Sequence, residues 1–224
     1  MIRHGFSTQI EGNSEEERLR MVREQLRGRG ITDERVLAAM AKVPREEFAE
    51  TASATHAYGD HPLPIGSGQT VSQPYMIASM VQTLELQAHD RVLEIGTGTG
   101  YEAAVLAELA AEVWTVERYP ELAATAQQIL ARLAYTNVHV AVGDGSVGLP
   151  QQAPFDKIVV AAAAPSLPPA LVEQLAEGGI LVLPIGSRTD QQVQLVRKQA
   201  GEITVAYREF CRFVPLVGEA GWKE

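Results

Sequence analysis

The stretch VLEIGTGTGYEAAVLA, residues 92–107, joins an apolar strand to a helix through a glycine-rich turn. Three glycines, Gly96, Gly98 and Gly100, allow the backbone of this turn to approach a ligand closely. In open α/β sheets, ligands bind beyond the carboxyl ends of the strands. The turn therefore predicts a cofactor site, although a glycine turn alone would also fit an ordinary strand–helix connection.

Short apolar segments rich in Val and Ile surround this turn, and helical patterns separate them. The predicted strands are RVLEI, VWTVE, VHVAV, KIVVAA and ILVLPI, and the predicted helices span residues 101–111, 120–134 and 168–176. This alternation indicates an α/β fold with a parallel sheet that is covered on both faces. After residue 185 the alternation stops, and VQLVRK, ITVAYREF and CRFVPLV predict three closing strands at an antiparallel end of the sheet.

A length of 224 residues suits one substantial domain. Residues 1–13 show no periodicity, so we expect a loose N-terminal tail. Residues 14–224 are expected to form a single domain. Within it we expect N-terminal helices and a substrate and cofactor loop over 14–80, a cofactor-binding α/β core over 91–185, and closing strands over 190–217.

The composition excludes several classes of protein. A formal net charge of −9 disfavours general binding to nucleic acid or membrane surfaces, which needs clustered Lys and Arg. The single cysteine, Cys211, permits no disulfide within the chain. No apolar run reaches the roughly 18 residues of a spanning helix, and the N-terminus lacks a signal-peptide pattern. We therefore expect a cytoplasmic protein, and we predict no metal because the histidines lack ligand spacing.

Three acidic residues accompany the glycine turn. Glu94 precedes the first glycine by two positions, Glu117 ends the next strand, and Asp144 follows the third strand. Glu117 could accept hydrogen bonds from ribose hydroxyls and Asp144 could meet an adenine amino group, although a strand-end charge and a turn residue are the simpler alternatives. Together these acids favour a cationic sulfonium over a pyrophosphate, and hence S-adenosylmethionine over NAD.

Upstream of the turn, GQTVSQPYM (residues 68–76) is a more specific motif. With the glycine turn, GDG, APFDKIVVAAA, LVEQLAEGGILVLPIG and RFVPLV, it resembles the protein-L-isoaspartate O-methyltransferase family from about residue 30 to 217. The resemblance implies a Rossmann-like class I S-adenosylmethionine-dependent methyltransferase fold. Its sheet would be mostly parallel and seven-stranded, with an antiparallel C-terminal end and added N-terminal helices.

The same resemblance implies a protein repair activity. A methyl group would move from S-adenosylmethionine to the α-carboxylate of L-isoaspartyl residues in damaged proteins and peptides, leaving S-adenosylhomocysteine; activity on D-aspartyl residues stays open. A free carboxylate is already more than about 99% ionised at pH 7, so it needs no general base. The enzyme's task would be orientation and exclusion of water, worth roughly 7–11 kcal/mol.

The resemblance also carries site residues. It places Ser72 beside the methyl group and the substrate carboxylate, as an orienting hydrogen-bond donor rather than a nucleophile; a turn-stabilising serine is the alternative. The implied cofactor-binding residues are Thr70, Val71, Gln73, Glu94, Gly96, Thr97, Gly98, Gly100, Glu117, Arg118, Asp144 and Gly145. The implied substrate-binding residues are Leu63, Pro64, Ile65, Gly66, Val214, Pro215 and Leu216, for which core packing is the alternative.

Other functions remain open at this stage. The chain could methylate a small molecule, another protein group or a nucleic acid, although it is acidic and Ala163-Ala164-Pro165-Ser166 replaces the Asn-Pro-Pro-Tyr type of turn found in base methyltransferases. The glycine spacing disfavours an NAD-dependent dehydrogenase. A non-catalytic cofactor-binding protein is a further alternative. We expect isoaspartyl peptides and proteins as partners, no nucleic acid, no membrane, and a monomer.

Overall fold

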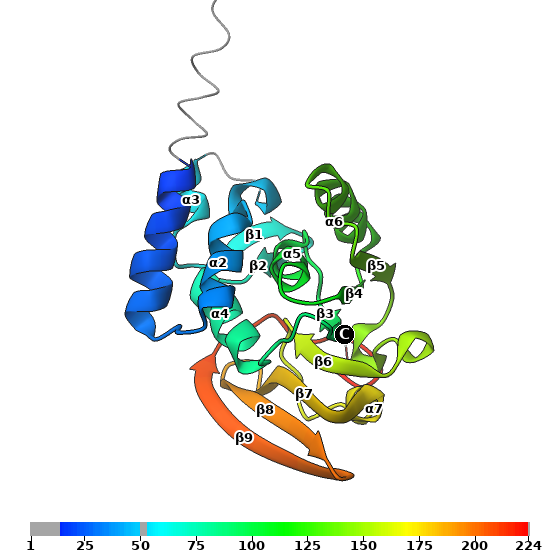
Figure 1. The fold of residues 1–224 in the computed structure, drawn as a ribbon. Helices are drawn as coiled ribbons and strands as arrows, with labels where there is room; N and C mark the ends of the chain where they lie inside the picture. The colour runs from blue at the N-terminus through cyan, green and yellow to red at the C-terminus, as the bar shows by residue number, and fades with distance from the viewer. Residues whose placement is uncertain (1–13, 50–52, 224) are drawn as a thin grey trace, which may run out of the picture.

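The computed structural model describes residues 14–49 and 53–223, so the predicted tail over residues 1–13 lies outside the described residues. Its central feature is a seven-stranded sheet of order β5-β4-β3-β6-β7-β8-β9 (Figure 1). The first five strands of this order pair in parallel, whereas β8 and β9 pair antiparallel. The predicted mostly parallel sheet with an antiparallel C-terminal end is therefore confirmed. The strands are β3 (Arg91–Ile95), β4 (Glu112–Glu117), β5 (Val138–Val142), β6 (Phe155–Val160), β7 (Leu175–Gly186), β8 (Gln191–Gln199) and β9 (Glu202–Cys211).

Helices alternate with the parallel strands, as the sequence predicts, but each is shorter than expected. They are α5 (Tyr101–Ala107), α6 (Pro120–Arg132) and α7 (Pro169–Gln174), with the short 3₁₀ helices η4 (Gly145–Val147) and η5 (Pro150–Gln152). Helix α6 ends early because Ala134 adopts a left-handed backbone conformation. Helix α7 stops because residue 175 already belongs to β7. Short helix–strand connections keep successive strand ends close together.

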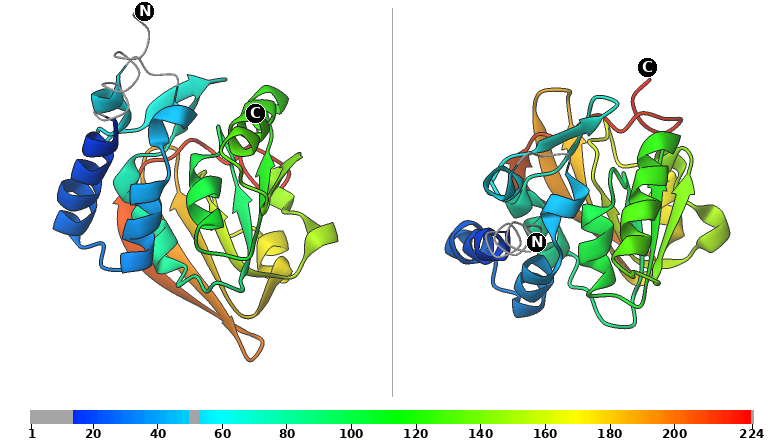
Figure 2. Two further views of the ribbon diagram at one scale, coloured as in Figure 1. Left: turned by 45° about the horizontal axis from the view of Figure 1, so that its top comes forward. Right: turned by 90° about the horizontal axis from the view of Figure 1, so that it is seen from above.

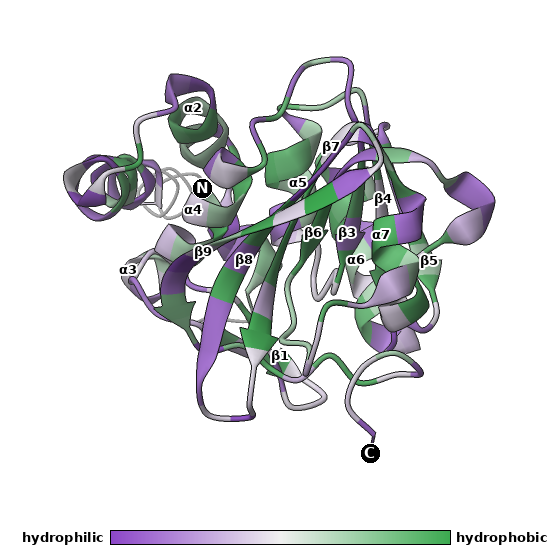
Figure 3. Ribbon diagram, turned by 90° about the horizontal axis from the view of Figure 1, so that it is seen from below, coloured by the Kyte–Doolittle hydropathy of each residue, from purple (hydrophilic) through white to green (hydrophobic). Residues whose placement is uncertain are grey.

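Two apolar clusters fill the two faces of the sheet. On one face, β-strand residues such as Val92, Val113 and Val159 pack against the N-terminal region, α4, α5 and α6. On the other face, Leu93, Phe155 and their neighbours pack against α7 and against residues of the C-terminal segment. Figure 3 shows hydrophobic residues concentrated in the central strands. Burial on both faces explains why these strands are continuous apolar runs rather than alternating ones.

The N-terminal region forms helical segments beside the sheet (Figure 2). Residues 14–20 are helical and continue into the π-helical turn η1 (Met21–Leu26) and the 3₁₀ turn η2 (Arg27–Arg29). Gly30 ends this run in a left-handed conformation, and the Asp33 carboxylate then caps α2 (Glu34–Lys42) by accepting the Arg35 backbone N–H. Two short helices follow, η3 (Arg45–Phe48) and α3 (Ala54–Ala57).

The segment around residues 68–76 is more ordered than a loop. The strands β1 (Leu63–Gly66) and β2 (Gln69–Val71) form a separate antiparallel hairpin whose turn, residues 66–68, has positive φ angles throughout. Ser72 and Gln73 then link β2 to α4 (Pro74–Thr83). Pro74 occupies the first turn of that helix, where its missing N–H is harmless. Ser72 is thus held between a strand and a helix.

The prediction of a third closing strand over CRFVPLV is wrong. VQLVRK and ITVAYREF lie in β8 and β9, but of the third segment only Cys211 belongs to a strand, at the end of β9. Pro215 makes a single isolated bridge to Ala163, and the Phe213 backbone N–H donates to the Gln191 side chain instead of to a strand. A proline has no N–H with which to continue a ladder. The segment therefore turns across the strand ends and back toward the centre of the sheet.

Candidate active site

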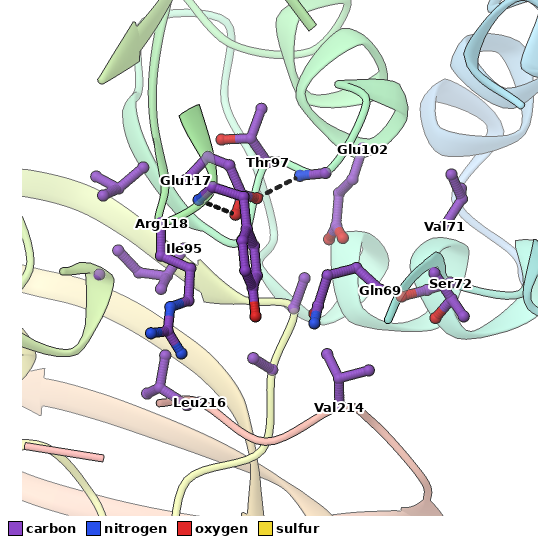
Figure 4. Close-up of a pocket in the computed structure, with 18 of the residues that line it drawn as sticks. Gln69, Val71, Ser72, Ile95, Thr97, Glu102, Glu117, Arg118, Val214 and Leu216 are labelled. Atoms are coloured by element: carbon purple, nitrogen blue, oxygen red, sulfur yellow. Dashed lines mark hydrogen bonds between the residues drawn. The ribbon is translucent and has the colours of Figure 1, made fainter. Parts of the chain in front are cut away.

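A cavity lies at the carboxyl ends of β3, β4 and β6, between the glycine turn, the link before α4 and the C-terminal segment (Figure 4). Its volume is about 730 Å³ when its open mouth is included. The position is the one that an open α/β sheet favours for a ligand.

The structure brings most of the predicted site residues to this cavity. Those that line it are Thr70, Val71, Ser72, Gly96, Thr97, Gly98, Glu117, Arg118, Gly145, Val214, Pro215 and Leu216. Those outside its lining are Leu63, Pro64, Ile65, Gly66, Gln73, Glu94, Gly100 and Asp144. The lining residues that the sequence did not single out are Gln69, Ile77, Ile95, Thr99, Tyr101, Glu102, Val116, Tyr119, Ala161, Ala162 and Val217.

The Glu117 carboxylate fixes the glycine turn from the end of the neighbouring strand. Its two oxygens accept backbone N–H groups, from Gly98 at 2.8 Å and from Tyr119 at 3.0 Å (Figure 4). Gly98 has a φ of +54°, and a Cβ at this position would come within 3.0 Å of the Ile65 side chain. Each carboxylate oxygen can accept a second hydrogen bond. The arrangement therefore holds the turn in place and leaves acceptor capacity for a ligand hydroxyl.

Beneath the turn lies the fully buried Glu94. The Thr115 hydroxyl donates to its Oε2 at 2.5 Å, and the hydroxyls of Thr97 and Thr115 lie 2.6 Å apart. Its other oxygen, Oε1, has no hydrogen-bond partner in the described chain. Glu94 therefore supports the turn from behind and does not line the cavity itself.

Glu102 is a buried acid in the cavity wall, and sequence reasoning missed it. Its side chain points into the cavity, and its Oε1 is a buried acceptor without a partner among the described residues. Burial raises the pKa of Glu102 to about 8. Burial, and then the nearby Glu102 carboxylate, also raise the pKa of Glu94 well above its ordinary value. The one feature of the sequence that could have pointed to Glu102 is its position as an acidic residue within the otherwise apolar sequence of α5.

Asp144 fastens the C-terminal segment. Its carboxylate accepts the Ser146 backbone N–H at 2.8 Å and the Glu219 backbone N–H at 2.7 Å. The Trp222 indole N–H donates to the Ala163 carbonyl at 3.1 Å, which holds the same segment farther along. The C-terminal segment thereby becomes one wall of the cavity, through Val214 and Leu216 (Figure 4).

Ser72 lies where the cavity meets a second, smaller crevice. Thr70, Ser72, Ala161 and Val214 line both spaces. The crevice is completed by Pro62, Gln73, Met76, Arg212 and Phe213. Within the described residues the Ser72 side chain makes no hydrogen bond, so its hydroxyl is available to a ligand in either space. Two ligands could therefore meet at Ser72, one on each side.

Among residues 14–49 and 53–223, no group of three or more His, Cys, Asp and Glu side chains is arranged to hold a metal ion. In the same part of the chain, no helix combines the length and apolar character needed to cross a membrane.

The seven-stranded, mostly parallel sheet with its antiparallel end is the fold of the class I S-adenosylmethionine-dependent methyltransferases. The glycine turn bonded to an acid at the next strand end and the cavity over the strand ends agree with this class. The model of the protein-L-isoaspartate(D-aspartate) O-methyltransferase family matches residues 16–221. The chain belongs to this family, as its sequence predicted. It is accordingly an S-adenosylmethionine-dependent methyltransferase of protein repair.

Individual relatives agree with this membership. The chain is 56% identical over 206 residues to a protein-L-isoaspartate O-methyltransferase of Koribacter versatilis, covering 92% of this chain and 93% of the relative. It is 53% identical to one of Methanoculleus marisnigri, covering 92% and 94%. A solved structure of a protein-L-isoaspartate O-methyltransferase superposes with a TM-score of 0.82 at 29% identity, covering 92% of this chain and 67% of that one. A Plasmodium falciparum structure described as such an enzyme with S-adenosyl-L-homocysteine gives 0.78 at 27% identity, covering 89% and 98%.

Proposed function

We propose that the cavity holds S-adenosylmethionine and the crevice holds the α-carboxylate of an L-isoaspartyl residue, with Ser72 between them. One observation carries this proposal: Thr70, Ser72, Ala161 and Val214 line both spaces. Methyl transfer needs the two reactants in contact but each in its own site. Two neighbouring spaces that have Ser72 in the lining of both meet that need.

The residues present fit the cofactor. A sulfonium and an ammonium group are cationic, and the cavity wall supplies the Glu102 carboxyl group with an unpartnered oxygen. Glu117 has acceptor capacity left for ribose hydroxyls, and Gly96 and Gly98 keep the turn free of side chains. We place the adenine near Gly145, with Asp144 behind it, and Arg118 on the same side. In the proposal Thr70, Val71 and Thr97 contact the cofactor, whereas Gln73, Glu94 and Gly100 lie outside the lining and take part by supporting the residues that do.

S-adenosylmethionine supplies an activated methyl group, so the protein itself needs no nucleophile. Ser72 orients the substrate carboxylate by donating one hydrogen bond. Apolar groups that line the same cavity, among them Val71, Val214 and Leu216, would exclude water from the reacting atoms. In a dry site a fixed donor is worth more than in water because it needs no reorganisation.

The peptide around the isoaspartyl residue would lie over the hairpin and the C-terminal segment. Its main-chain contacts are assigned to Leu63, Pro64, Ile65, Gly66, Val214, Pro215 and Leu216. Pro64, Gly66 and Pro215 are the exposed members of this set. We further propose that residues 14–224 act as one domain, as a monomer, in the cytoplasm.

The decisive experiment compares two peptides that differ only in one linkage. We expect labelled methyl to pass from S-adenosylmethionine to an isoaspartyl peptide, and little or none to its aspartyl twin. Equal labelling of both peptides would overturn the isoaspartyl assignment while sparing the methyltransferase activity. Labelling of neither, with cofactor binding intact, would favour a non-catalytic protein or one that methylates another substrate.

A further inference from the structure

A groove continues outward from the crevice, between the start of α4 and the end of β9. Apolar and aromatic residues form much of its wall, including Pro62, Tyr75 and Phe213. Phe210 on its rim is 80% exposed, which is unusual for so large an apolar side chain. Pro62, Gln73, Met76, Arg212 and Phe213 belong to both groove and crevice. A peptide whose isoaspartyl carboxylate enters the crevice would therefore lie along this groove.

The charge of the groove is opposite to that of the whole chain. The protein carries a formal net charge of −9, yet three arginines line the groove, Arg29, Arg188 and Arg212, against one acid, Glu209. A local field of this sign attracts anionic groups toward the groove. The groove can therefore favour substrates with negative charge over substrates with positive charge.

Arg212 is the arginine best able to take a new partner. Arg29 is paired with Asp60 and its guanidinium lies 3.6 Å from the centre of the Tyr75 ring. Arg188 lies over the Trp222 ring. Arg212 is exposed, lines both the crevice and the groove, and makes no hydrogen bond or ion pair within the described part of the chain.

The reacting carboxylate is a poor partner for this arginine. Methyl transfer converts that carboxylate to a neutral ester, so its negative charge declines in the transition state. An ion pair to it would stabilise the ground state more than the transition state and would slow the reaction. Ser72, a neutral donor, carries a smaller penalty of the same kind. A second anion on the substrate is therefore a better partner for Arg212 than the reacting carboxylate.

We propose that Arg212 is a specificity-determining residue that makes the enzyme favour isoaspartyl peptides carrying an acidic residue next to the isoaspartyl position. The inference rests on the proposed function, because it assumes that the crevice holds the reacting carboxylate. The expected preference is modest, since an exposed ion pair changes affinity by about 2- to 5-fold.

The test uses isoaspartyl peptides that differ at one neighbouring position, Glu, Gln or Lys, placed before or after the isoaspartyl residue. On at least one side, wild-type protein should show a KM about 2- to 5-fold lower for the Glu peptide than for the Gln peptide, and highest for the Lys peptide. Arg212→Gln should bring the KM ratio of the Glu and Gln peptides to about 1. Arg212→Glu should reverse the order, so that the Lys peptide becomes the best substrate.

Arg208→Gln is the matched control, because Arg208 is an exposed arginine on β9 outside the groove lining. It removes the same charge and should leave the KM ratio as in the wild type. Equal KM values for all wild-type peptides, or the same change in both variants, would overturn the inference. Absence of methylation on every isoaspartyl peptide would instead overturn the proposed function.

Discussion

The Asp144 carboxylate accepts the backbone N–H of Glu219 at 2.7 Å, which joins the turn after β5 to the C-terminal segment. The neighbouring Ser146 hydroxyl accepts the Ala220 backbone N–H at 3.0 Å. Residue 218, directly before these two N–H donors, has to be a glycine, because a Cβ there would overlap an Asp144 oxygen. Val214 and Leu216, which precede this link, form one wall of the cavity. The hydrogen bonds from Asp144 and Ser146, in the turn after β5, therefore hold this wall of the cavity in place.

Replacing Asp144 should loosen this wall. Asp144→Ala leaves the partly buried N–H group of Ser146 and the exposed N–H group of Glu219 without their charged acceptor, and we expect the free energy of unfolding to fall by about 1–3 kcal/mol. Urea unfolding measures the change. Glu219→Ala is the control, since it removes a carboxylate but keeps the main-chain donor, and it should leave stability within about 0.5 kcal/mol. A similar loss in both variants would contradict the assigned link.

Glu117→Ala should weaken cofactor binding by about 1.5–3 kcal/mol, the range for hydrogen bonds to a charged group. The variant loses the ribose acceptor, and it also releases the Gly98 backbone N–H. Calorimetry with S-adenosylhomocysteine measures the dissociation constant. Glu112→Gln, at the opposite end of β4, should bind normally.

The cofactor choice is tested in the same titrations. NAD should give no heat of binding with the wild-type protein, because the Glu117 carboxylate would repel a pyrophosphate. A clear signal with NAD would revive a dehydrogenase. An unchanged affinity of Glu117→Ala for S-adenosylhomocysteine would return Glu117 to the role of a strand-end charge that only holds the turn.

Glu102 makes stability depend on pH in a defined direction. Its pKa is about 8 in the folded protein against an ordinary 4.5, so the folded state binds more protons between these values. Stability therefore falls as pH rises from 4.5 to 8, by up to about 1.4 kcal/mol per pH unit, and this loss is complete above pH 8. Glu102→Gln removes the titrating group and should be more stable than wild type at pH 8, with a smaller difference at pH 5.

Urea unfolding of both proteins at pH 5, 6.5 and 8 measures this difference. Glu202→Gln on the exposed surface of β9 is the control, and its difference from wild type should not change with pH. A Glu102→Gln difference that stays constant from pH 5 to 8 would mean that Glu102 is ionised throughout. The unpartnered oxygen would then need another explanation.

The sequence predicts the centre of this fold well because the information there is local. Apolar strand, glycine turn and helix follow one another in residues 92–107, and a strand, a short turn and a helix again follow one another around Glu117. The C-terminal end of the sheet is harder to predict from the sequence. CRFVPLV has a strand-like composition, but its partners are Gln191 and Ala163, which lie far away in the sequence. The segment turns back because of contacts that exist only once the sheet has formed.

The candidate site likewise combines features that local sequence predicts with features that depend on distant residues. The motif around Ser72 can be recognised from its residues, yet the hairpin that holds it depends on pairing between Leu63 and Val71. Glu102 and Arg212 lie within the motifs of residues 92–107 and 212–217, but these motifs alone give neither residue a role. Glu102 matters because the fold buries it beside Glu94, and Arg212 because the chain leaves β9 at the mouth of the crevice. Burial and cavity position are properties of the folded chain, so a single sequence does not reveal them.

Ser72→Ala tests the proposed chemistry most directly. If Ser72 orients the substrate carboxylate, the variant loses one hydrogen bond to a charged group, about 1.5–3 kcal/mol, and kcat/KM falls about 10- to 150-fold. If Ser72 were a covalent nucleophile, the loss would be about 10⁴-fold or more. If Ser72 only braced its turn, activity would survive and Tm would fall.

The structure sharpens the choice between these outcomes. Because the Ser72 hydroxyl has no partner within the described residues, its removal should leave Tm unchanged, whereas activity should fall. Ser67→Ala is a matched control, since that hydroxyl bonds only to the exposed Glu121 and its loss should spare kcat/KM. Measuring kcat/KM and Tm for both variants separates orientation from bracing. Full activity in Ser72→Ala would end the orienting role, and a methylated Ser72 trapped during turnover would replace direct transfer with a two-step reaction.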